Sequence, residues 1–369
     1  MKGWLARWQT ETGDVHVLAL ARVGIGVLLF WQCLDLAREL AQNGYFGAGF
    51  HMPFLPEVLV PSSSVYKAAL AARVLLGVLV AIGYFARPAL LASAVLGGWA
   101  LLCDRVHFHH NRYALLCFAF LLAFSPCDRA LSIISSSPKV ERPRIGALWA
   151  QRLAALQLSL IYLASGGSKL LDADWRGGVV IGDRFARFGH QALERGVPGR
   201  LVEAISQPWA TSALAKLAIA TELFLAFGLW SKRTRIFGLW LGLMFHLTIE
   251  VTSNVELFTL LSLTVYILFA TPDFRARKLR YDPTRRRGKI YAQLVGALDW
   301  LARFEIRAWE PDGLRQGHAL VIVRRDGTRA TGVRALAMVA RCVPLLFPLW
   351  PLLAFVASFT RGGETSARS

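Results

Sequence analysis

Long apolar stretches alternate with short polar connectors along most of the chain. Eight of these stretches have the length and apolar content expected of helices that cross the hydrocarbon core of a bilayer. They cover residues 15–37, 65–86, 88–103, 113–127, 148–169, 212–230, 235–251 and 255–271. The pattern predicts an all-α polytopic membrane protein with about eight transmembrane helices.

Basic residues gather in alternate connectors between these stretches, at residues 85–87, 139–144, 232–235 and 275–280. Short loops rich in Lys and Arg are retained in the cytoplasm. With eight helices, all four basic connectors fall on the same side, so we expect both termini to be cytoplasmic. The loops expected on the opposite, extracytoplasmic side cover residues 38–64, 104–112, 170–211 and 252–254.

The sequence changes character after the eighth stretch. Residues 272–341 hold 16 Lys and Arg against seven Asp and Glu, a net charge of +9. A strand over 318–325, a turn at Asp326–Gly327 and a helix from Gly332 predict a small α/β domain. We therefore divide the chain into a membrane domain, 1–271, and a tail, 272–369, which should face the cytoplasm and anionic lipid.

The end of the tail is apolar again over residues 342–359, but this run contains three prolines. We expect it to lie at the membrane interface, with a ninth transmembrane helix as the alternative.

Composition supports a membrane environment. Hydrophobic residues make up 55% of the 369 residues and the mean hydropathy is +0.43, which would leave a soluble domain with too much apolar surface in water. The net charge of +18 lies mostly in connectors and tail, so it reflects membrane topology, and we expect no nucleic-acid partner. The five cysteines form no CxxC pair, and neither a disulfide framework nor a zinc site is expected.

Ionisable side chains inside the apolar stretches are candidates for chemistry, because a charge in hydrocarbon is costly unless it faces a cavity or a partner. Glu222 lies in the middle of the sixth stretch and Arg22 lies in the first. A structural, hydrogen-bonded carboxyl group is the simpler alternative for Glu222. Arg22 requires an acidic partner or an anionic ligand.

The outer end of the seventh stretch carries His246, Glu250 and Asn254 at a spacing of four residues. If the helix continues that far, the three side chains share one face. A carboxylate one turn from an imidazole could form a proton-transfer pair with it. The alternative is a polar helix end that faces water.

Two further groups of polar residues lie next to expected extracytoplasmic loops. Lys169 ends the fifth stretch, where a lysine often only extends to the membrane interface. The loop before the fourth stretch contains three histidines and an asparagine, namely His107, His109, His110 and Asn111. No HExxH motif or carboxylate-rich companion supports a metal site, so we expect acid–base or polar substrate contacts here.

The segment 161–177 reads IYLASGGSKLLDADWRG, in which Tyr162 and small residues precede Lys169 and the string LDADW. This segment resembles the vitamin K-dependent γ-carboxylase-like, or HTTM, membrane family. Shorter pieces agree with the family across roughly residues 10–272. They are ARVGIG from Ala21, HNRY from His110, and LMFH ending at His246.

The resemblance implies a membrane enzyme that uses O2 to epoxidise a reduced naphthoquinone. The strong base so formed would remove a proton from the γ-carbon of a peptide glutamate, to which CO2 would add. Lys169 would be the catalytic base and His246 a hydrogen-bond donor to a quinone or oxyanion oxygen. The partners implied are the lipid bilayer, a quinone and a small secreted peptide, and the expected location is the bacterial inner membrane.

The sequence departs from the family pattern at one position that bears on this chemistry. Animal carboxylases have two lysines before LDADW, and the second, which is credited with starting oxygenation, corresponds here to Leu170. Lys169 matches the first. Since a leucine cannot deprotonate a hydroquinone, either Lys169 takes this role or the reaction differs.

The tail resembles a degenerate DCC-type thioredoxin-like domain. That family opens with a YDGDCxxC-like loop after a strand, whereas this chain reads YDPTRRRG from Tyr281 to Gly288, without either cysteine. The later segment DGTRATGVRAL from Asp326 fits a DG-to-TGxxAL pattern of the same family. Without a pair of thiols no disulfide exchange is possible, so we expect a redox-inactive domain that docks a partner or lipid.

Together these observations predict an outward-opening cavity among the first, fifth, sixth and seventh stretches, lined by Arg22, Lys169, Glu222 and His246. Further cavity or substrate contacts are expected from Tyr162, His109, His110, Asn111, Asp172, Asp174, Trp175 and Glu250. Two other functions stay open: a non-enzymatic membrane partner in the maturation, export or immunity of a secreted peptide, and a proton-coupled transporter with Glu222 and His246 as a relay. We find no inverted repeat of the kind common in transporters.

Overall fold

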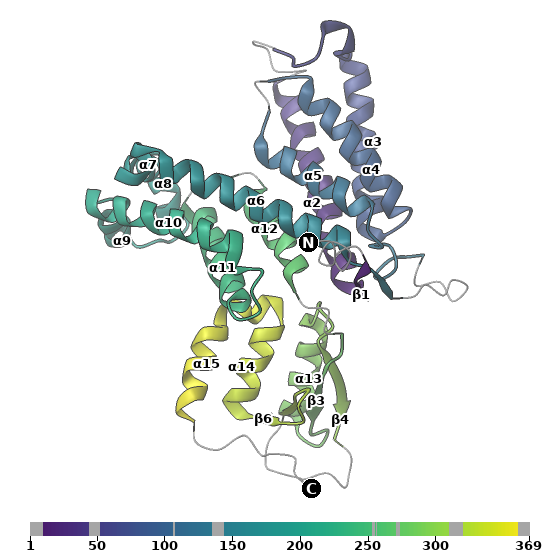
Figure 1. Ribbon diagram of the computed structural model, residues 1–369, viewed down its shortest axis with the longest axis vertical. Helices are drawn as coiled ribbons and strands as arrows, with labels where there is room; N and C mark the ends of the chain where they lie inside the picture. Colours follow the sequence, from purple (N-terminus) through teal and green to yellow (C-terminus); the bar gives the residue numbers. More distant parts are fainter. Residues whose placement is uncertain are drawn as a thin grey trace. The chain divides into compact units, whose positions relative to one another are not determined.

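The computed structural model describes residues 10–43, 52–105, 108–134, 144–252, 255, 257–270, 274–309 and 320–360. The chain divides into two compact units, Met1–Ala270 and Thr271–Ser369. The first unit is almost entirely helical, and the second contains a small sheet (Figure 1).

Each of the eight apolar stretches forms a helix, so this part of the prediction is confirmed. The helices formed by these stretches are α2 (His16–Asn43), α3 (Ser63–Ile82), α4 (Ala86–Leu102), α5 (His110–Ala123), α6 (Trp149–Leu171), α10 (Pro208–Gly228), α11 (Arg235–Thr252) and α12 (Phe258–Tyr266). A 3-10 turn, η2 (Ile267–Phe269), extends α12, and η1 (Glu57–Leu59) precedes α3.

Four of these helices are long and apolar enough to cross a membrane: His16–Gln42 of α2, α3, α10 and α11. The helices Ala86–Leu102 and Phe258–Phe269 are apolar but shorter. Several apolar side chains, such as Leu75, Leu217 and Phe227, are at least 60% exposed on these helices, a surface suited to lipid. The apolar helices indicate a membrane protein, while the count of eight spans and their orientation stay predictions.

Glycines allow α2 and α3 to pack closely. A Cβ atom added at Gly26 of α2 would lie 2.4 Å from the backbone nitrogen of Ala81, and one added at Gly77 of α3 would lie 2.8 Å from that of Phe30. Small residues at such a contact let two helix backbones approach closely, a common source of stability in membranes. The close pairing of α2 with α3 therefore depends on the absence of a side chain at Gly26 and Gly77.

Arg22 has a structural role that differs from the one predicted. Its guanidinium group is fully buried and donates to the carbonyl oxygens of Val80 at 2.6 Å, Ala81 at 3.1 Å and Leu131 at 2.5 Å. The carbonyls at the end of α3 lack partners within their own helix and carry the negative end of its dipole. Arg22 thus caps α3 through backbone oxygens, a role that was not predicted, and an acidic partner or anionic ligand stays a prediction.

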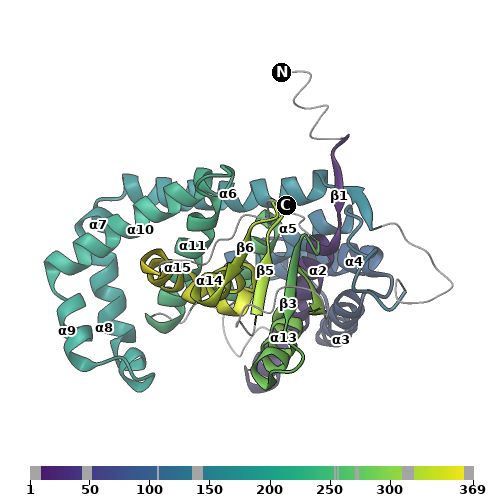
Figure 2. The ribbon, with the colours of Figure 1, turned by 90° about the horizontal axis from the view of Figure 1, so that it is seen from below.

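The region after α6, which was expected to be an extracytoplasmic loop, is also helical. It contains α7 (Ala173–Gly177), α8 (Val179–Glu194) and α9 (Gly199–Ile205). Both views place these helices at the carboxyl end of α6 (Figures 1 and 2). At the other end, β1 (Thr12–Asp14) pairs antiparallel with β2 (Ile145–Ala147) and ties the start of the chain to the segment before α6.

The second unit contains a four-stranded sheet with helices packed on it. Its elements are β3 (Arg277–Tyr281), α13 (Arg286–Leu298), β4 (Phe304–Ala308), β5 (Leu320–Val323), β6 (Arg329–Thr331), α14 (Gly332–Cys342), η3 (Pro344–Leu349) and α15 (Trp350–Phe359). The strand order is β4-β3-β5-β6, in which β3 and β4 are parallel and the other pairs antiparallel. The predicted strand before Asp326 and the helix from Gly332 are confirmed, whereas α13 was not predicted.

The close contact between α2 and α3 makes Gly26 sensitive to the smallest substitution. We expect Gly26→Ala to lower the stability of the protein in detergent by about 1–3 kcal/mol, because the new methyl group meets backbone atoms that cannot move independently. Gly98→Ala is the matched control, since a Cβ atom there meets nothing within 4 Å. Equal apparent Tm values for the two variants would contradict the close packing.

Candidate functional site

One face of α6 presents polar side chains toward the neighbouring helices. Tyr162, Ser165 and Lys169 are spaced by three and four residues, so they lie along a single helical face. α6 packs against α10 and α12, and α10 packs against α11. The side chains that meet this face come from those three helices.

Lys169 and Glu222 form a largely buried ion pair between α6 and α10. The Nζ atom of Lys169 lies 2.5 Å from Oε1 of Glu222, and the two side chains are 17% and 4% exposed. Ser165 joins them, because its Oγ accepts from Lys169 at 2.8 Å and donates to Glu222 at 3.2 Å. A carboxyl group at mid-helix therefore has a cationic partner, which reduces the cost of burying it.

The LDADW string, residues 171–175, shapes the surroundings of Lys169. The Asp172 carboxylate accepts from the backbone N–H groups of Asp174 at 2.8 Å and Trp175 at 3.2 Å, so it caps the short helix α7. This turn brings the indole of Trp175 over Lys169, with Nζ 4.8 Å from the ring centroid. Arg184 of α8 also lies over this ring, at 5.5 Å.

The predicted site residues of this string differ in their surroundings. Asp172 serves as a helix cap, and the side chain of Asp174 is exposed on α7. Trp175 contacts Lys169 through its aromatic face, an arrangement that favours a cation.

A second polar cluster is formed by His246, Tyr162 and Tyr266 of α11, α6 and α12. The Tyr162 hydroxyl lies 2.7 Å from Nε2 of His246 and also forms a short hydrogen bond with the Tyr266 hydroxyl. His246 is fully buried. Gly242, one turn before His246, leaves room for Tyr266, because an added Cβ would lie 2.1 Å from the Tyr266 hydroxyl oxygen.

Two buried atoms at these clusters have no hydrogen-bond partner among the described residues. They are Oε2 of Glu222 and Nδ1 of His246. Buried polar atoms are nearly always paired, so an unpaired one calls for an explanation. Both atoms belong to side chains that sequence analysis named as candidates, and together they could receive polar groups of a substrate.

The predicted histidine loop occupies another part of the fold. His109 and His110 stack on each other with ring centroids 4.8 Å apart, at the start of α5, where His109 accepts from the backbone N–H of Asn111 at 3.4 Å. Asn111 is buried, and α5 packs against α2, α4 and α6. His107 lies outside the described residues.

The predicted face of α11 is divided between interior and surface. Glu250 lies one turn after His246 but is exposed, and its carbonyl oxygen accepts a hydrogen bond from Arg195. Asn254 lies outside the described residues. Among the described residues, no group of three or more His, Cys, Asp or Glu side chains could hold a metal ion.

Sequence analysis missed several buried polar residues. Ser165 and Tyr266 complete the two clusters, yet small polar and aromatic residues are common in apolar helices and give no distinct signal. Arg73 of α3 is 3% exposed and donates to Oε1 of Gln32 in α2 at 3.2 Å. Arg73 could have been found by the same search for mid-stretch charges that identified Arg22.

The ion pair predicts a thermodynamic coupling between Lys169 and Glu222. We expect Lys169→Met and Glu222→Gln each to lower stability, and the double variant to lose about 1–3 kcal/mol less than the sum, because neither partner is then left alone in the interior. Unfolding in mild detergent measures the cycle, with exposed Glu250→Gln as a control for lost charge. Strictly additive losses would show that the two side chains do not interact.

Comparison with protein families places this cluster in a known context. The chain matches the HTTM domain over residues 11–274, which includes the helices from α2 to α12. Comparison with curated proteins and with solved structures gave no match. Because the match covers more than half of the chain, the protein belongs to the HTTM family, the family of vitamin K-dependent carboxylase-like proteins.

Proposed function

We propose that this protein is a membrane enzyme that oxygenates a reduced naphthoquinone and uses the resulting base to carboxylate a peptide glutamate. The observation that carries the proposal is the Lys169–Glu222 pair next to Tyr162 and His246, with buried, unpartnered atoms on both Glu222 and His246. Membership of the HTTM family supports it.

The proposed reaction balances without a metal or an external reductant. A reduced naphthoquinone gives up its two hydroxyl protons and is oxidised by four electrons, two in forming the quinone and two in epoxidation of the ring double bond, and O2 accepts all four. One oxygen atom remains in the epoxide and the other leaves as water. An oxygenated quinone anion removes a proton from the γ-carbon of glutamate, and the carbanion adds to CO2.

In this proposal the polar residues handle protons and orient the quinol. Lys169 first passes a proton along its short hydrogen bond to Glu222, and the neutral amine then accepts the proton of the quinol hydroxyl. His246 donates from a ring nitrogen to a quinone oxygen, and Tyr162 holds the imidazole through its hydroxyl. Trp175 covers Lys169 and limits access of water.

Leu170 bears on which residue acts as the base. Its side chain is 46% exposed, whereas that of Lys169 is 17% exposed and points to Glu222. Consecutive residues on a helix differ by about 100° in direction. Position 170 therefore faces away from the ion pair, and we assign the base to Lys169.

We also propose a location and an orientation for the protein. The basic connectors support insertion in the bacterial inner membrane with both termini in the cytoplasm and the chemistry on the extracytoplasmic side. The peptide that carries the glutamate would then be a small secreted one.

For the tail we propose a thioredoxin-like domain of DCC type that has lost its redox centre. Two features support this proposal. The elements follow in the order of a βαβ unit, an antiparallel hairpin and a helix, and a loop follows Tyr281 at the end of β3. This loop joins strand β3 to helix α13, the place where the family carries its cysteines, and here it reads DPTR. The buried Cys342 is the only thiol among the tail residues, and one thiol cannot close an internal disulfide.

The test is epoxide formation from a reduced naphthoquinone by the purified protein in detergent under O2. We expect the native chain to form product and Lys169→Ala, Glu222→Gln and His246→Ala each to lose on the order of 100-fold or more of the rate, as removal of a general acid or base usually costs. Glu57→Ala, at an exposed position of η1, should keep the native rate.

A well-folded native protein that is inert with several quinols would contradict the enzyme assignment and favour the non-enzymatic partner of a secreted peptide. Full activity in Lys169→Ala would show that the protein is an oxygenase whose base is another residue. With epoxide formation established, incorporation of labelled CO2 into a glutamate peptide tests the second half of the reaction.

A further inference from the structure

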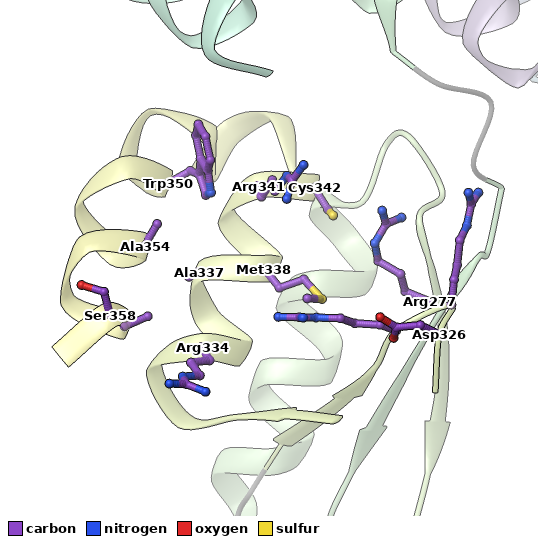
Figure 3. A pocket seen from close by; sticks show the side chains of 13 residues that line it. Arg277, Asp326, Arg334, Ala337, Met338, Arg341, Cys342, Trp350, Ala354 and Ser358 are labelled. Carbon is purple, nitrogen blue, oxygen red and sulfur yellow. The ribbon is translucent and has the colours of Figure 1, made fainter. Parts of the chain in front are cut away.

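The second unit contains a cavity that the proposed oxygenation does not use. Its volume is about 610 Å³, within the range of about 300–1,000 Å³ usual for small-molecule sites. Helices α14 and α15 form one wall, and β3 and the turn after β5 form the other (Figure 3).

The charge of this cavity is strongly one-sided. Among the described residues, its lining contains one carboxylate, Asp326, and the five arginines Arg277, Arg324, Arg325, Arg334 and Arg341. Oδ1 of Asp326 also accepts from the backbone and hydroxyl of Thr328, at 3.0 and 2.6 Å, within its own turn. The described lining residues thus carry a formal charge of about +4.

A second cavity on the same unit shows that this imbalance is local. It has a volume of about 440 Å³ and is lined by Arg275 and Arg307 together with Asp299 and Glu305. Positive and negative side chains are equal in number there, although the unit as a whole is basic. The excess of arginines is thus a property of the first cavity.

The wall formed by α14 and α15 is apolar between the arginines. Ala337, Met338, Trp350 and Ala354 line it, and Figure 3 shows these residues on the two helices across from Arg277 and Asp326. Arg341 lies over the indole of Trp350 at 5.8 Å. Arg334 donates to the carbonyl oxygen of Thr360 at 3.1 Å, which anchors this side chain at the cavity edge.

Guanidinium groups bind phosphate oxygens through two parallel hydrogen bonds, and several of them around one cavity suit an anion with more than one negative charge. The apolar wall suits the organic part of such a ligand. We propose that this cavity binds a phosphate ester of at least two negative charges, the chemistry shared by anionic phospholipid headgroups and free organophosphates.

The first experiment uses equilibrium dialysis of the full chain, in a non-ionic detergent, with radiolabelled pyrophosphate. We expect saturable binding that Arg325→Gln/Arg341→Gln weakens by about tenfold or more, because each side chain is exposed at the cavity and supplies one charged contact. The matched control is Arg286→Gln/Arg287→Gln, two exposed arginines of α13 outside the cavity, which should change affinity less than about twofold.

Equal weakening in the two double variants would overturn the site, since binding would then follow net charge alone. Absence of saturable binding, with both pyrophosphate and dihexanoyl phosphatidic acid, would overturn it as well. Should the cavity variant fail to fold, Arg341→Lys keeps the charge but loses the two-pronged geometry, and its affinity should still fall several-fold.

Competition identifies the source of the phosphate group. If dihexanoyl phosphatidic acid displaces pyrophosphate much better than inorganic phosphate does, the ligand is a lipid headgroup. Dihexanoyl phosphatidylcholine is the neutral control. Displacement by free organophosphates with no advantage for the lipid assigns a soluble ligand. Both results support a phosphate site, and neither depends on quinol oxygenation.

Discussion

The ion pair between Lys169 and Glu222 constrains the helical unit, because an unpaired charge in an apolar interior is too costly to persist. It requires α6 and α10 to lie side by side in one register. In that register Tyr162, on the same face of α6 as Lys169, meets His246 of α11 and Tyr266 of α12. The capping of α7 by Asp172 then brings Trp175 over the lysine. The polar clusters thus follow from one electrostatic requirement.

Buried charge is handled in two ways in this protein. Lys169 meets a carboxylate, whereas Arg22 meets three backbone carbonyl oxygens near the end of α3 and at Leu131. A guanidinium group has five donors in a planar fork, so it can satisfy several carbonyls, while an ammonium group behaves as a compact charge. The ion pair leaves Oε2 of Glu222 without a hydrogen-bond partner among the described residues, whereas Arg22 links α2 to the end of α3 and to Leu131.

The sequence predicted the helices better than the contacts between them. Apolar length is a local property, so all eight stretches could be recognised. Lys169, Tyr162, Glu222 and His246 were named as candidates, and the structure brings them to adjoining clusters. The contacts of Arg22 were not predicted, because a sequence does not show which helix ends lie near a side chain. The capping role of Asp172 was not predicted either, because a sequence does not distinguish a capping carboxylate from one in a site.

The 53 residues that separate Lys169 from Glu222 along the chain affect how the protein is made. During synthesis α6 is complete before α10 exists, so the lysine enters or approaches the bilayer without its counter-ion. If α6 crosses the membrane, as its apolar length predicts, we expect it to insert stably only when α10 is present to neutralise the lysine. The order of translation would then make the integration of the fifth apolar segment conditional on the sixth.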